Sequence, residues 1–232
     1  MKTQLVIAAA GMGVRLGRAQ PKALVGLAGQ PMIVRTLMRF ESMGLVDRAI
    51  VVVPGDYQAV FEETLAEAYP AVSLVFVRGG AQRQESVRRG LTCLDPATDI
   101  AVIHDAARPF VPERAIRKVC VTAAGEGAAT MAIPCSDTIL EVDEENRLLD
   151  TPDRQRLWTC QTPQAFRVPV IQEAHERALR QGFAVTDDAS LARWAGYEVR
   201  VVMGSPLNFK ITKPEDLMLA ERMLQGGWSC TE

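Results

Sequence analysis

The chain has 232 residues, 48% of them hydrophobic and 6% aromatic, which suits a single α/β domain with a sizeable core over residues 1–232. Its formal net charge of −2 argues against a nucleic-acid partner, because no basic surplus is available to neutralise a phosphate backbone. No apolar run approaches the roughly twenty residues that cross a bilayer, so we expect no membrane span.

The five cysteines are odd in number and are nowhere spaced C-x-x-C. They are Cys93, Cys120, Cys135, Cys160 and Cys230. Neither a disulfide framework nor a zinc site is therefore indicated. Unpaired thiols fit a reducing, cytoplasmic setting best.

The first predicted strand, Leu5 to Ala10, runs into a glycine-rich turn that is followed by two cations. Gly11 and Gly13 permit positive φ and close backbone approach, so that consecutive N–H groups can point at anionic oxygens. Arg15 and Lys22 add full positive charges. The segment predicts a polyphosphate-binding loop, with a merely structural turn as the alternative.

Two better-known phosphate-binding loops do not fit this segment. The dinucleotide fingerprint G-x-G-x-x-G opens directly into a helix, whereas here the third glycine comes one residue late and Pro21 follows soon after. The Walker A string G-x-x-x-x-G-K-[ST] occurs nowhere in the chain. The strings Pro21-Lys22 and Gly29-Gln30-Pro31 instead resemble the start of the sugar-nucleotide nucleotidyltransferases.

Short apolar runs without alternation recur along the first half of the chain, separated by segments with helical spacing. The runs are Leu5–Ala10, Ala49–Val53, Leu74–Val77 and Ile100–Ile103. In the clearest helical segment, the residues expected on the buried face are Tyr57, Val60, Phe61, Leu65 and Ala68. This alternation of strands and helices predicts a doubly wound, mostly parallel sheet whose ligands bind beyond the carboxyl ends of the strands.

The loops after the third and fourth strands carry polar side chains. After the third strand, the pair Gly79-Gly80 precedes a helix whose first turn holds Arg83 and Ser86, and helix N-termini attract anions. After the fourth comes Asp105, which suits a magnesium ion because Mg²⁺ takes one or two carboxylates together with phosphate oxygens. The alternative is an ion pair between Asp105 and Arg108 that closes the loop.

The alternation of apolar strands with helical segments ends near residue 134. Thr138–Val142 and Arg147–Leu149 read as two strands around a polar turn, which makes residues 134–160 a hairpin arm outside the main sheet. A lone two-stranded hairpin is marginally stable in water, so we expect the arm to pack on another subunit. The alternative is that it folds back over its own domain.

The last part of the chain returns to helices and one strand. Residues 169–181 are amphipathic, Thr186-Asp187-Asp188 is typical of a helix start, and residues 198–203 are rich in β-formers. Thr212 and Glu215 form a capping-box pattern, so the final helix should begin there, with Lys210 on a strand just before it. No linker or repeat divides the chain, and we predict no second domain.

Eight strings in order closely resemble the 2-C-methyl-D-erythritol 4-phosphate cytidylyltransferase family of the non-mevalonate isoprenoid pathway. Beginning with residues 9–15 and Pro21-Lys22, they continue through the Gly79 to Val87 loop, residues 104–109, Asp137-Thr138, residues 162–166, residues 186–190 and residues 210–216. The resemblance covers nearly the whole chain. It implies a Rossmann-like nucleotidyltransferase fold, a magnesium cofactor, and a homodimer formed through the arm.

The resemblance implies that a phosphate oxygen of methylerythritol phosphate attacks the α-phosphorus of CTP in line and releases pyrophosphate. It implies that Arg15 and Lys22 stabilise the transition state, and that Arg154 and Lys210 hold the attacking phosphate. The implied nucleotide pocket consists of Ala9, Ala10, Gly11, Gly80, Arg83, Ser86 and Ala106. The implied contacts to the methylerythritol part are Asp105, which also binds magnesium, Arg108, Thr138 and Thr162.

The chain departs from the family pattern at two places, and rival readings stay open. Ala23 and Leu24 follow the Pro-Lys pair, and Ala81 stands where an acidic residue is common. The nearest rival is a ribitol-5-phosphate cytidylyltransferase, although Ala107 favours the first assignment. More distant rivals are a non-catalytic nucleotide-sensing subunit and an oxidoreductase.

Overall fold

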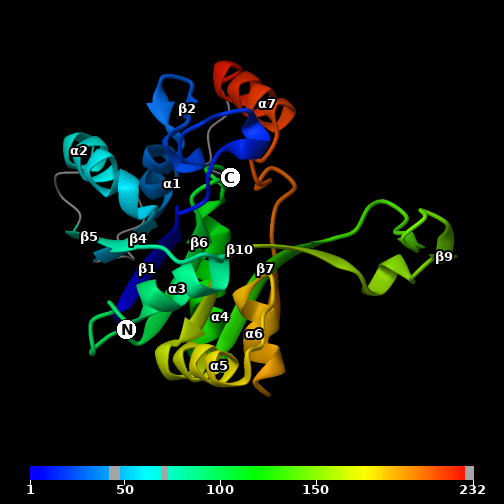
Figure 1. The fold of residues 1–232 in the computed structure, drawn as a ribbon. Coiled ribbons are helices and arrows are strands. Elements are labelled where there is room, and N and C mark those ends of the chain that lie inside the picture. The colour runs from blue at the N-terminus through cyan, green and yellow to red at the C-terminus, as the bar shows by residue number, and fades with distance from the viewer. Residues whose placement is uncertain (42–47, 69–72, 228–232) are drawn as a thin grey trace.

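The fold is built on one seven-stranded sheet in the order β11-β7-β10-β6-β1-β4-β5 (Figure 1). The computed structural model describes residues 1–41, 48–68 and 73–227, so Cys230 lies outside the described residues. The strands are β1 (Thr3–Ala8), β4 (Arg48–Val53), β5 (Ser73–Arg78), β6 (Ile100–Asp105), β7 (Ala128–Pro134), β10 (Trp158–Arg167) and β11 (Arg200–Met203). β10 runs antiparallel to β6 and β7, and the other neighbours are parallel, which confirms the predicted mostly parallel sheet.

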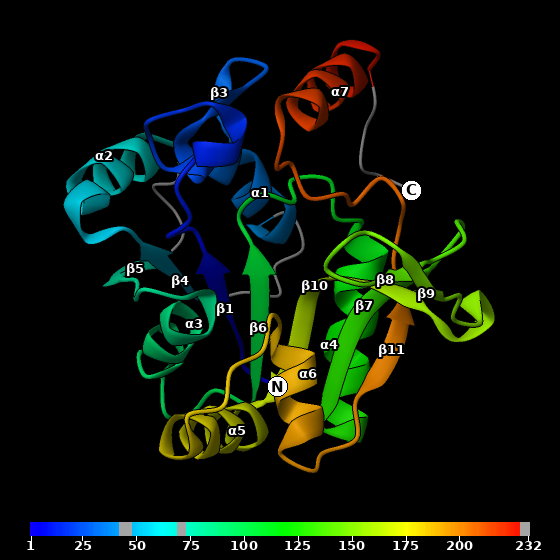
Figure 2. The same ribbon diagram turned by 45° about the vertical axis from the view of Figure 1, so that its right-hand side comes forward.

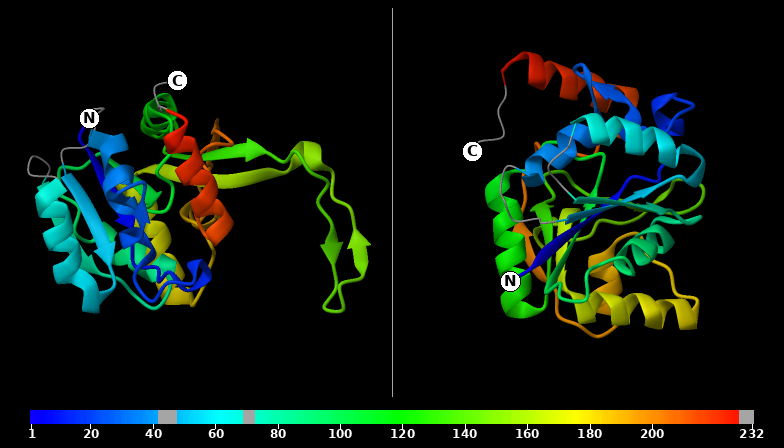
Figure 3. Two further views of the ribbon diagram at one scale, coloured as in Figure 1. Left: turned by 90° about the horizontal axis from the view of Figure 1, so that it is seen from above. Right: turned by 90° about the vertical axis from the view of Figure 1, so that its left-hand side faces the viewer.

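Helices cover both faces of this sheet, as Figures 2 and 3 show. One face packs against α1 (Met32–Glu41), α2 (Gln58–Ala68) and α4 (Glu113–Glu126). The other packs against α3 (Arg83–Leu91), α5 (Val168–Gln181) and α6 (Asp188–Trp194). Successive residues of a strand point to opposite faces, so in β1 Leu5 and Ile7 join the first core while Val6 joins the second. This explains why the strands read as unbroken apolar runs.

The chain order reverses between β1 and β6. From β1 the chain passes to β4 and β5 on one side, and then returns through α3 to β6 on the other side of β1. In open α/β sheets the crevice beyond the strand ends at such a point is the usual ligand site. Ala9 and Asp105 lie at this point, at the carboxyl ends of the two strands.

Shorter elements shape the loops around that crevice. The 3-10 helices are η1 (Val14–Leu16), η2 (Lys22–Leu24), η3 (Gly55–Tyr57) and η4 (Arg154–Arg156), and β2 (Gly26–Leu27) pairs with β3 (Gln30–Pro31). Helix α7 (Pro214–Gln225) packs through Ala220 against a small core with Leu16, Leu27 and Phe110. The C-terminal helix therefore buttresses the loop after β1.

The predicted hairpin arm is present and stands away from the sheet (Figures 1 and 3). Its tip pairs β8 (Glu141–Val142) with β9 (Leu148–Asp150) in antiparallel register. The arm does not fold back over its own sheet. Its apolar side chains are exposed at Ile139, Leu140, Val142, Leu148, Leu149 and Trp158. That the whole of residues 1–232 forms a single domain stays a prediction.

Three expectations about local structure are wrong. In α2 only Phe61 and Leu65 are buried, while Val60 is 46% exposed and Ala68 is exposed, because α2 presents a narrow stripe to the sheet near its edge. The final helix begins at Pro214, and its capping carboxylate is Asp216, which accepts hydrogen bonds from the backbone of the two preceding residues, 212 and 213.

The third wrong expectation is that Lys210 lies on a strand. It lies in the loop between β11 and α7, where the N–H of the next residue, Ile211, donates to the carbonyl of Ala107 at 2.9 Å. This tertiary hydrogen bond holds the lysine beside the end of β6. Among the described residues, no helix is both long and apolar enough to cross a lipid bilayer.

Gly90 is where α3 lies closest to the sheet. A Cβ there would lie 2.7 Å from Cγ1 of Val6 and 2.9 Å from Cγ2 of Val52. We predict that Gly90→Ala destabilises the protein by about 1–3 kcal/mol through overpacking, despite the better helix propensity of alanine. Urea denaturation measures this.

The matched control is Gly125→Ala in α4, where an added Cβ meets nothing within 4 Å. It should leave stability unchanged or raise it by up to about 1 kcal/mol. Equal effects of the two substitutions would contradict the close packing at Gly90.

Candidate active site

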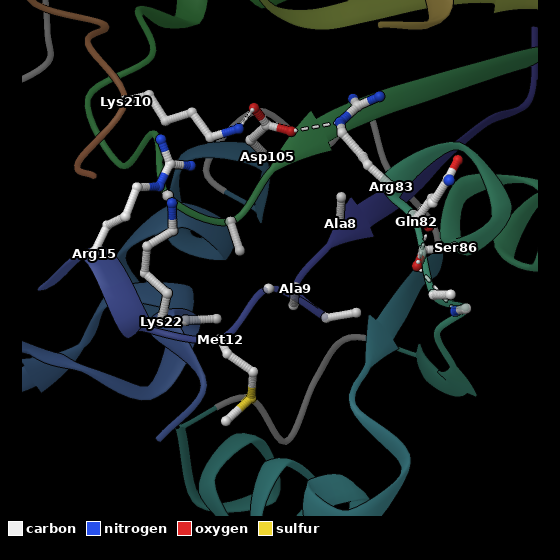
Figure 4. Close-up of a pocket in the computed structure, with 17 residues that line it drawn as sticks. Ala8, Ala9, Met12, Arg15, Lys22, Gln82, Arg83, Ser86, Asp105 and Lys210 are labelled. Carbon is white, nitrogen blue, oxygen red and sulfur yellow. Dashed lines mark hydrogen bonds and ion pairs between the residues drawn. The ribbon is translucent and has the colours of Figure 1, made fainter. Parts of the chain in front are cut away.

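A cavity of about 230 Å³ opens at the carboxyl ends of β1 and β6 (Figure 4). Three segments contribute most of its walls: the loop after β1, the start of α3 and the end of β6. Its lining residues are Ala8, Ala9, Ala10, Gly11, Met12, Arg15, Lys22, Ala23, Gly80, Ala81, Gln82, Arg83, Ser86, Asp105, Ala106, Ala107 and Lys210. All seven residues predicted for a nucleotide pocket are among them.

The loop after β1 is closed by backbone pairing across its base. Gly13 N–H donates to Gln20 O at 3.0 Å, and Lys22 N–H donates to Gly11 O at 2.9 Å, which brings Lys22 back beside the glycines. A Cβ on Gly13 would lie 2.9 Å from Gln20 O, so the two sides of the loop approach too closely for a side chain at this position. The predicted approach of these glycines to an anionic ligand stays a prediction.

Neither Gly11 nor Gly13 adopts the positive φ that glycine permits. Gly13 has φ −79°, and the left-handed residue of this loop is Gly17, with φ 67°. The N–H groups of Ala10, Gly11 and Met12 make no hydrogen bond within the described chain. Free amides beside cations suit an anionic ligand.

Lys22 is a mostly buried cation, and its surroundings disfavour the charge. Burial, together with the positive charges of Lys210 and Arg15, lowers its pKa to about 8 against the opposing effect of Asp105. An anionic ligand bound beside Lys22 would raise this pKa and stabilise the charged form of the lysine. The cavity is therefore electrostatically prepared for a polyanion.

Asp105 is the carboxylate at the centre of these cations. Its Oδ1 lies 3.1 Å from Arg83 Nε, and its Oδ2 lies 2.8 Å from Lys210 Nζ and 3.7 Å from Arg108 Nε. Burial would raise the pKa of Asp105, but Arg83, Lys210 and Arg108 together hold it well below its usual range. Asp105 is thus ionised. The ion pair with Arg108, which was the alternative to a magnesium-binding role, accounts for only one of its three contacts with cations.

A chain of hydrogen bonds fixes the backbone that carries Asp105. Asp105 N–H donates to Thr162 Oγ1 at 3.1 Å, and that hydroxyl lies 3.0 Å from His104 Nδ1. His104 Nε2 lies 3.0 Å from the Arg108 carbonyl oxygen. Burial lowers the pKa of His104 to about 4, so the neutral ring accepts from Thr162 and donates to Arg108. Thr162, predicted as a substrate contact, is only 4% exposed, and its hydroxyl binds the backbone N–H of Asp105.

Arg83 is held by a second carboxylate that sequence reasoning missed. Its Nη1 lies 2.7 Å from Asp188 Oδ2, and Asp188 Oδ1 lies 3.2 Å from His175 Nε2. The buried amide of Gln164 accepts from the N–H of Asp188 and of Ala189. The only signals for these roles were the Thr-Pro-Gln string and the Thr186 to Asp188 helix start, and neither reveals that the two segments meet behind Arg83.

The donor set fits magnesium only as an ion shared with a ligand. Among the described residues, no group of three or more His, Cys, Asp or Glu side chains could hold a metal. Of the described residues that line the cavity, Asp105 is the one with a carboxylate, and Mg²⁺ is commonly held by one or two carboxylates with substrate phosphates and water.

Besides Thr162, three predicted site residues do not line the cavity. Thr138 and Arg154 belong to the arm and do not line the cavity, and Arg154 Nη1 donates to Ser136 O at 3.0 Å. Arg108 lies behind the cavity, where Nη1 donates to Asn208 O at 2.7 Å. The structure therefore brings together Arg15, Lys22, Asp105 and Lys210, and leaves the arm residues apart (Figure 4).

Comparison with known proteins gives one consistent result. The model of the family described as IspD, 2-C-methyl-D-erythritol 4-phosphate cytidylyltransferase, matches residues 3–226. A relative of that name from Syntrophus aciditrophicus is 40% identical over 225 residues, which cover 97% of this chain and 96% of that protein. Another from Geobacter metallireducens is 42% identical over 224 residues, covering 95% and 96%.

Solved structures agree. The 4-diphosphocytidyl-2C-methyl-D-erythritol synthase of Anaerococcus prevotii superposes with a TM-score of 0.85 at 30% identity, covering 97% of this chain and 96% of that one. The 2-C-methyl-D-erythritol 4-phosphate cytidylyltransferase of Thermus thermophilus gives a TM-score of 0.79 at 33% identity, covering 97% and 100%.

The environment of Lys22 generates a measurable prediction. In lysine-labelled protein followed by NMR, we expect the Lys22 side chain to titrate with a midpoint of about 8. Asp105→Asn should lower that midpoint, because the carboxylate favours the charged amine, and added pyrophosphate should raise it. The signal is assigned by its loss in Lys22→Arg. A midpoint near 10.5 would show that Lys22 is not desolvated.

Proposed function

The chain belongs to the 2-C-methyl-D-erythritol 4-phosphate cytidylyltransferase family, and from this premise we propose how its residues share the reaction. The protein is a nucleotidyltransferase of isoprenoid biosynthesis that joins CTP and 2-C-methyl-D-erythritol 4-phosphate with release of pyrophosphate. The observation that carries the proposal is the convergence of Arg15, Lys22 and Lys210 on one cavity. Ribitol 5-phosphate as the alternative acceptor is not favoured by the comparisons.

In the proposed reaction, an oxygen of the acceptor phosphate forms a bond to the α-phosphorus of CTP. The bond between the α-phosphorus and its bridging oxygen breaks, and pyrophosphate leaves with the electron pair. Arg15 and Lys22 stabilise the charge that gathers at the α-phosphorus, and Lys210 holds the acceptor phosphate. Catalysis by positioned cations needs no covalent enzyme intermediate.

We propose magnesium as the cofactor and Asp105 as its protein ligand. Asp105 would hold the ion, which would supply two positive charges to offset the negative charges of the triphosphate. Lys210, which contacts Asp105 at 2.8 Å, lies close enough to this carboxylate to serve the acceptor phosphate beside it. Arg83 and Asp188 keep the carboxylate oriented toward the cavity.

The arm supports the proposal of a homodimer with composite sites. Its exposed apolar side chains, among them Leu140 and Leu148, need a surface to cover them. Thr138 and Arg154, which the family assigns to the acceptor, lie on this arm outside the cavity. In a two-fold dimer the arm of one subunit would carry both residues to the site of its partner. Free thiols at Cys93, Cys120 and the other described cysteines support a cytoplasmic location.

The substrate assignment is tested by pyrophosphate release. Four nucleoside triphosphates are each combined with methylerythritol phosphate or ribitol 5-phosphate in the presence of magnesium. We expect CTP with methylerythritol phosphate to be preferred, and a chelator to abolish turnover, because the metal completes the charge balance around the triphosphate. More efficient turnover of ribitol 5-phosphate would overturn the acceptor, and no release with any pair would favour a nucleotide sensor.

The composite site is tested by mixing two inactive homodimers, Lys22→Ala and Arg154→Ala, under conditions of subunit exchange. Each mixed dimer would have one doubly damaged site and one intact site. If random pairing makes half of the dimers mixed, activity should recover to about a quarter of the wild-type level. Recovery must follow exchange. No recovery after verified exchange would place Arg154 in the site of its own chain.

A further inference from the structure

The cavity has a charged end and an uncharged end (Figure 4). Arg15, Lys22 and Lys210 lie at the first. At the second lie Gly80, Ala81 and Ser86. We name the backbone of residues 79–81 the glycine turn. With the triphosphate at the cations, the base of the nucleotide lies at the glycine turn. The base selectivity proposed for this site rests on the proposed function and on this orientation of CTP.

All three N–H groups of the glycine turn are already used within the protein. Gly79 donates to Val53 O at 2.8 Å, Gly80 donates to Ser86 Oγ at 3.0 Å, and Ala81 donates to Glu85 Oε2 at 2.9 Å. The turn therefore has no N–H donor left for a ligand.

The carbonyl groups of the turn are used less completely. Gly79 O accepts from Arg89 Nη1 at 2.9 Å. The carbonyl oxygens of Gly80 and Ala81 accept no hydrogen bond from the described residues. Both residues line the cavity. The glycine turn is thus a surface of hydrogen-bond acceptors.

Two side chains of α3 hold the turn in this state. Glu85 and Arg89 form an ion pair one helical turn apart, with Glu85 bound to the N–H of Ala81 and Arg89 bound to the carbonyls of Arg78 and Gly79. A Cβ on Gly80 would lie 2.2 Å from the Glu85 carboxyl carbon, so the carboxylate lies directly against the turn. The N–H of Ala81 and the guanidinium of Arg89 also lower the pKa of Glu85, which keeps it an acceptor.

The other side of the turn is open. A second hollow of about 490 Å³ is lined by Pro54, Gly55 and Arg78 as well as by the turn itself. The turn therefore has room to move when the ion pair is removed. Ala81, which stands where an acidic side chain is common in the family, offers no carboxylate of its own.

We propose that the Glu85–Arg89 ion pair is a specificity-determining pair that selects cytosine over uracil by occupying the remaining donor of the glycine turn, the N–H of Ala81. Cytosine presents a 4-amino donor to the free carbonyls, whereas uracil presents a 4-oxo acceptor that finds no donor. An unmatched acceptor in a desolvated site carries the cost of its lost hydration. Glu85 and Arg89 act through the backbone and touch neither reacting phosphate.

The test compares the wild-type protein with Glu85→Ala, Arg89→Ala and Glu85→Gln. Turnover is measured with CTP and with UTP at saturating methylerythritol phosphate, and binding of each nucleotide alone is measured by calorimetry. Both alanine variants should lower the CTP/UTP ratio of kcat/KM by roughly tenfold or more, because Ala81 or the displaced turn can then donate to uracil. The change should appear mainly in KM and in Kd, with kcat for CTP kept within a few-fold.

Two variants serve as controls. Glu85→Gln should keep most of the selectivity, since its amide oxygen still accepts from Ala81. Glu176→Ala removes another i,i+4 pair, with Arg180 on α5, and should leave the ratio unchanged. Thermal unfolding is followed for every variant, and Glu85 and Arg89 are 35% and 38% exposed, so folding should persist.

An unchanged ratio in folded Glu85→Ala and Arg89→Ala would overturn the inference while leaving the proposed reaction intact. Equal use of CTP and UTP by the wild-type protein would overturn it as well. Failure of the wild-type protein to release pyrophosphate would contradict the proposed function alone, because the binding measurements still test the selectivity.

Discussion

The burial of one carboxylate, Asp105, organises this site. An ionised group removed from water must be paired, and Asp105 contacts Arg83, Lys210 and Arg108 at once. Asp105 and Asp188 together cannot balance these three cations and the nearby Lys22 and Arg15, so the cavity keeps a positive surplus although the whole chain carries a net charge of −2. Burial is the main cause of the lowered pKa of Lys22, and the neighbouring positive charges lower it as well. A polyphosphate is the ligand that relieves the positive surplus.

Rigidity around Asp105 comes from buried hydrogen bonds that cross between strands. His104 and Thr162 bind the backbone of residues 105–108, and Gln164 and Asp188 hold the segment behind Arg83. His104 lies on β6, and the other side chains come from β10 or from the start of α6; together they satisfy groups that would otherwise be unpaired in the core. The antiparallel strand β10, inserted between β6 and β7, therefore supports the site as well as the sheet.

The arm and the cavity divide the expected machinery between two parts of the chain. The sheet fixes the nucleotide side, where small movements would misplace the cations. The arm presents apolar residues such as Leu148, at 59% exposure, to a surface that one chain does not supply. Oligomers commonly close such surfaces by two-fold symmetry. The acceptor side of the reaction is thus the part that we expect a second copy of the chain to complete.

The sequence by itself determined the sheet type, the hairpin arm and the loop of glycines and cations after β1, because these follow from local periodicity, turn chemistry and residue spacing. It also singled out Asp105, Lys22 and Lys210. Only the tertiary structure decided how they meet. Lys210 lies in a loop that a hydrogen bond from Ile211 to Ala107 holds in place, and its contact with Asp105 joins residues 105 positions apart in the chain. The ion pair between Arg83 and Asp188 was likewise not predictable from the sequence. Such contacts depend on the order of strands in the sheet, which places distant loops at one edge, and no local pattern encodes that order.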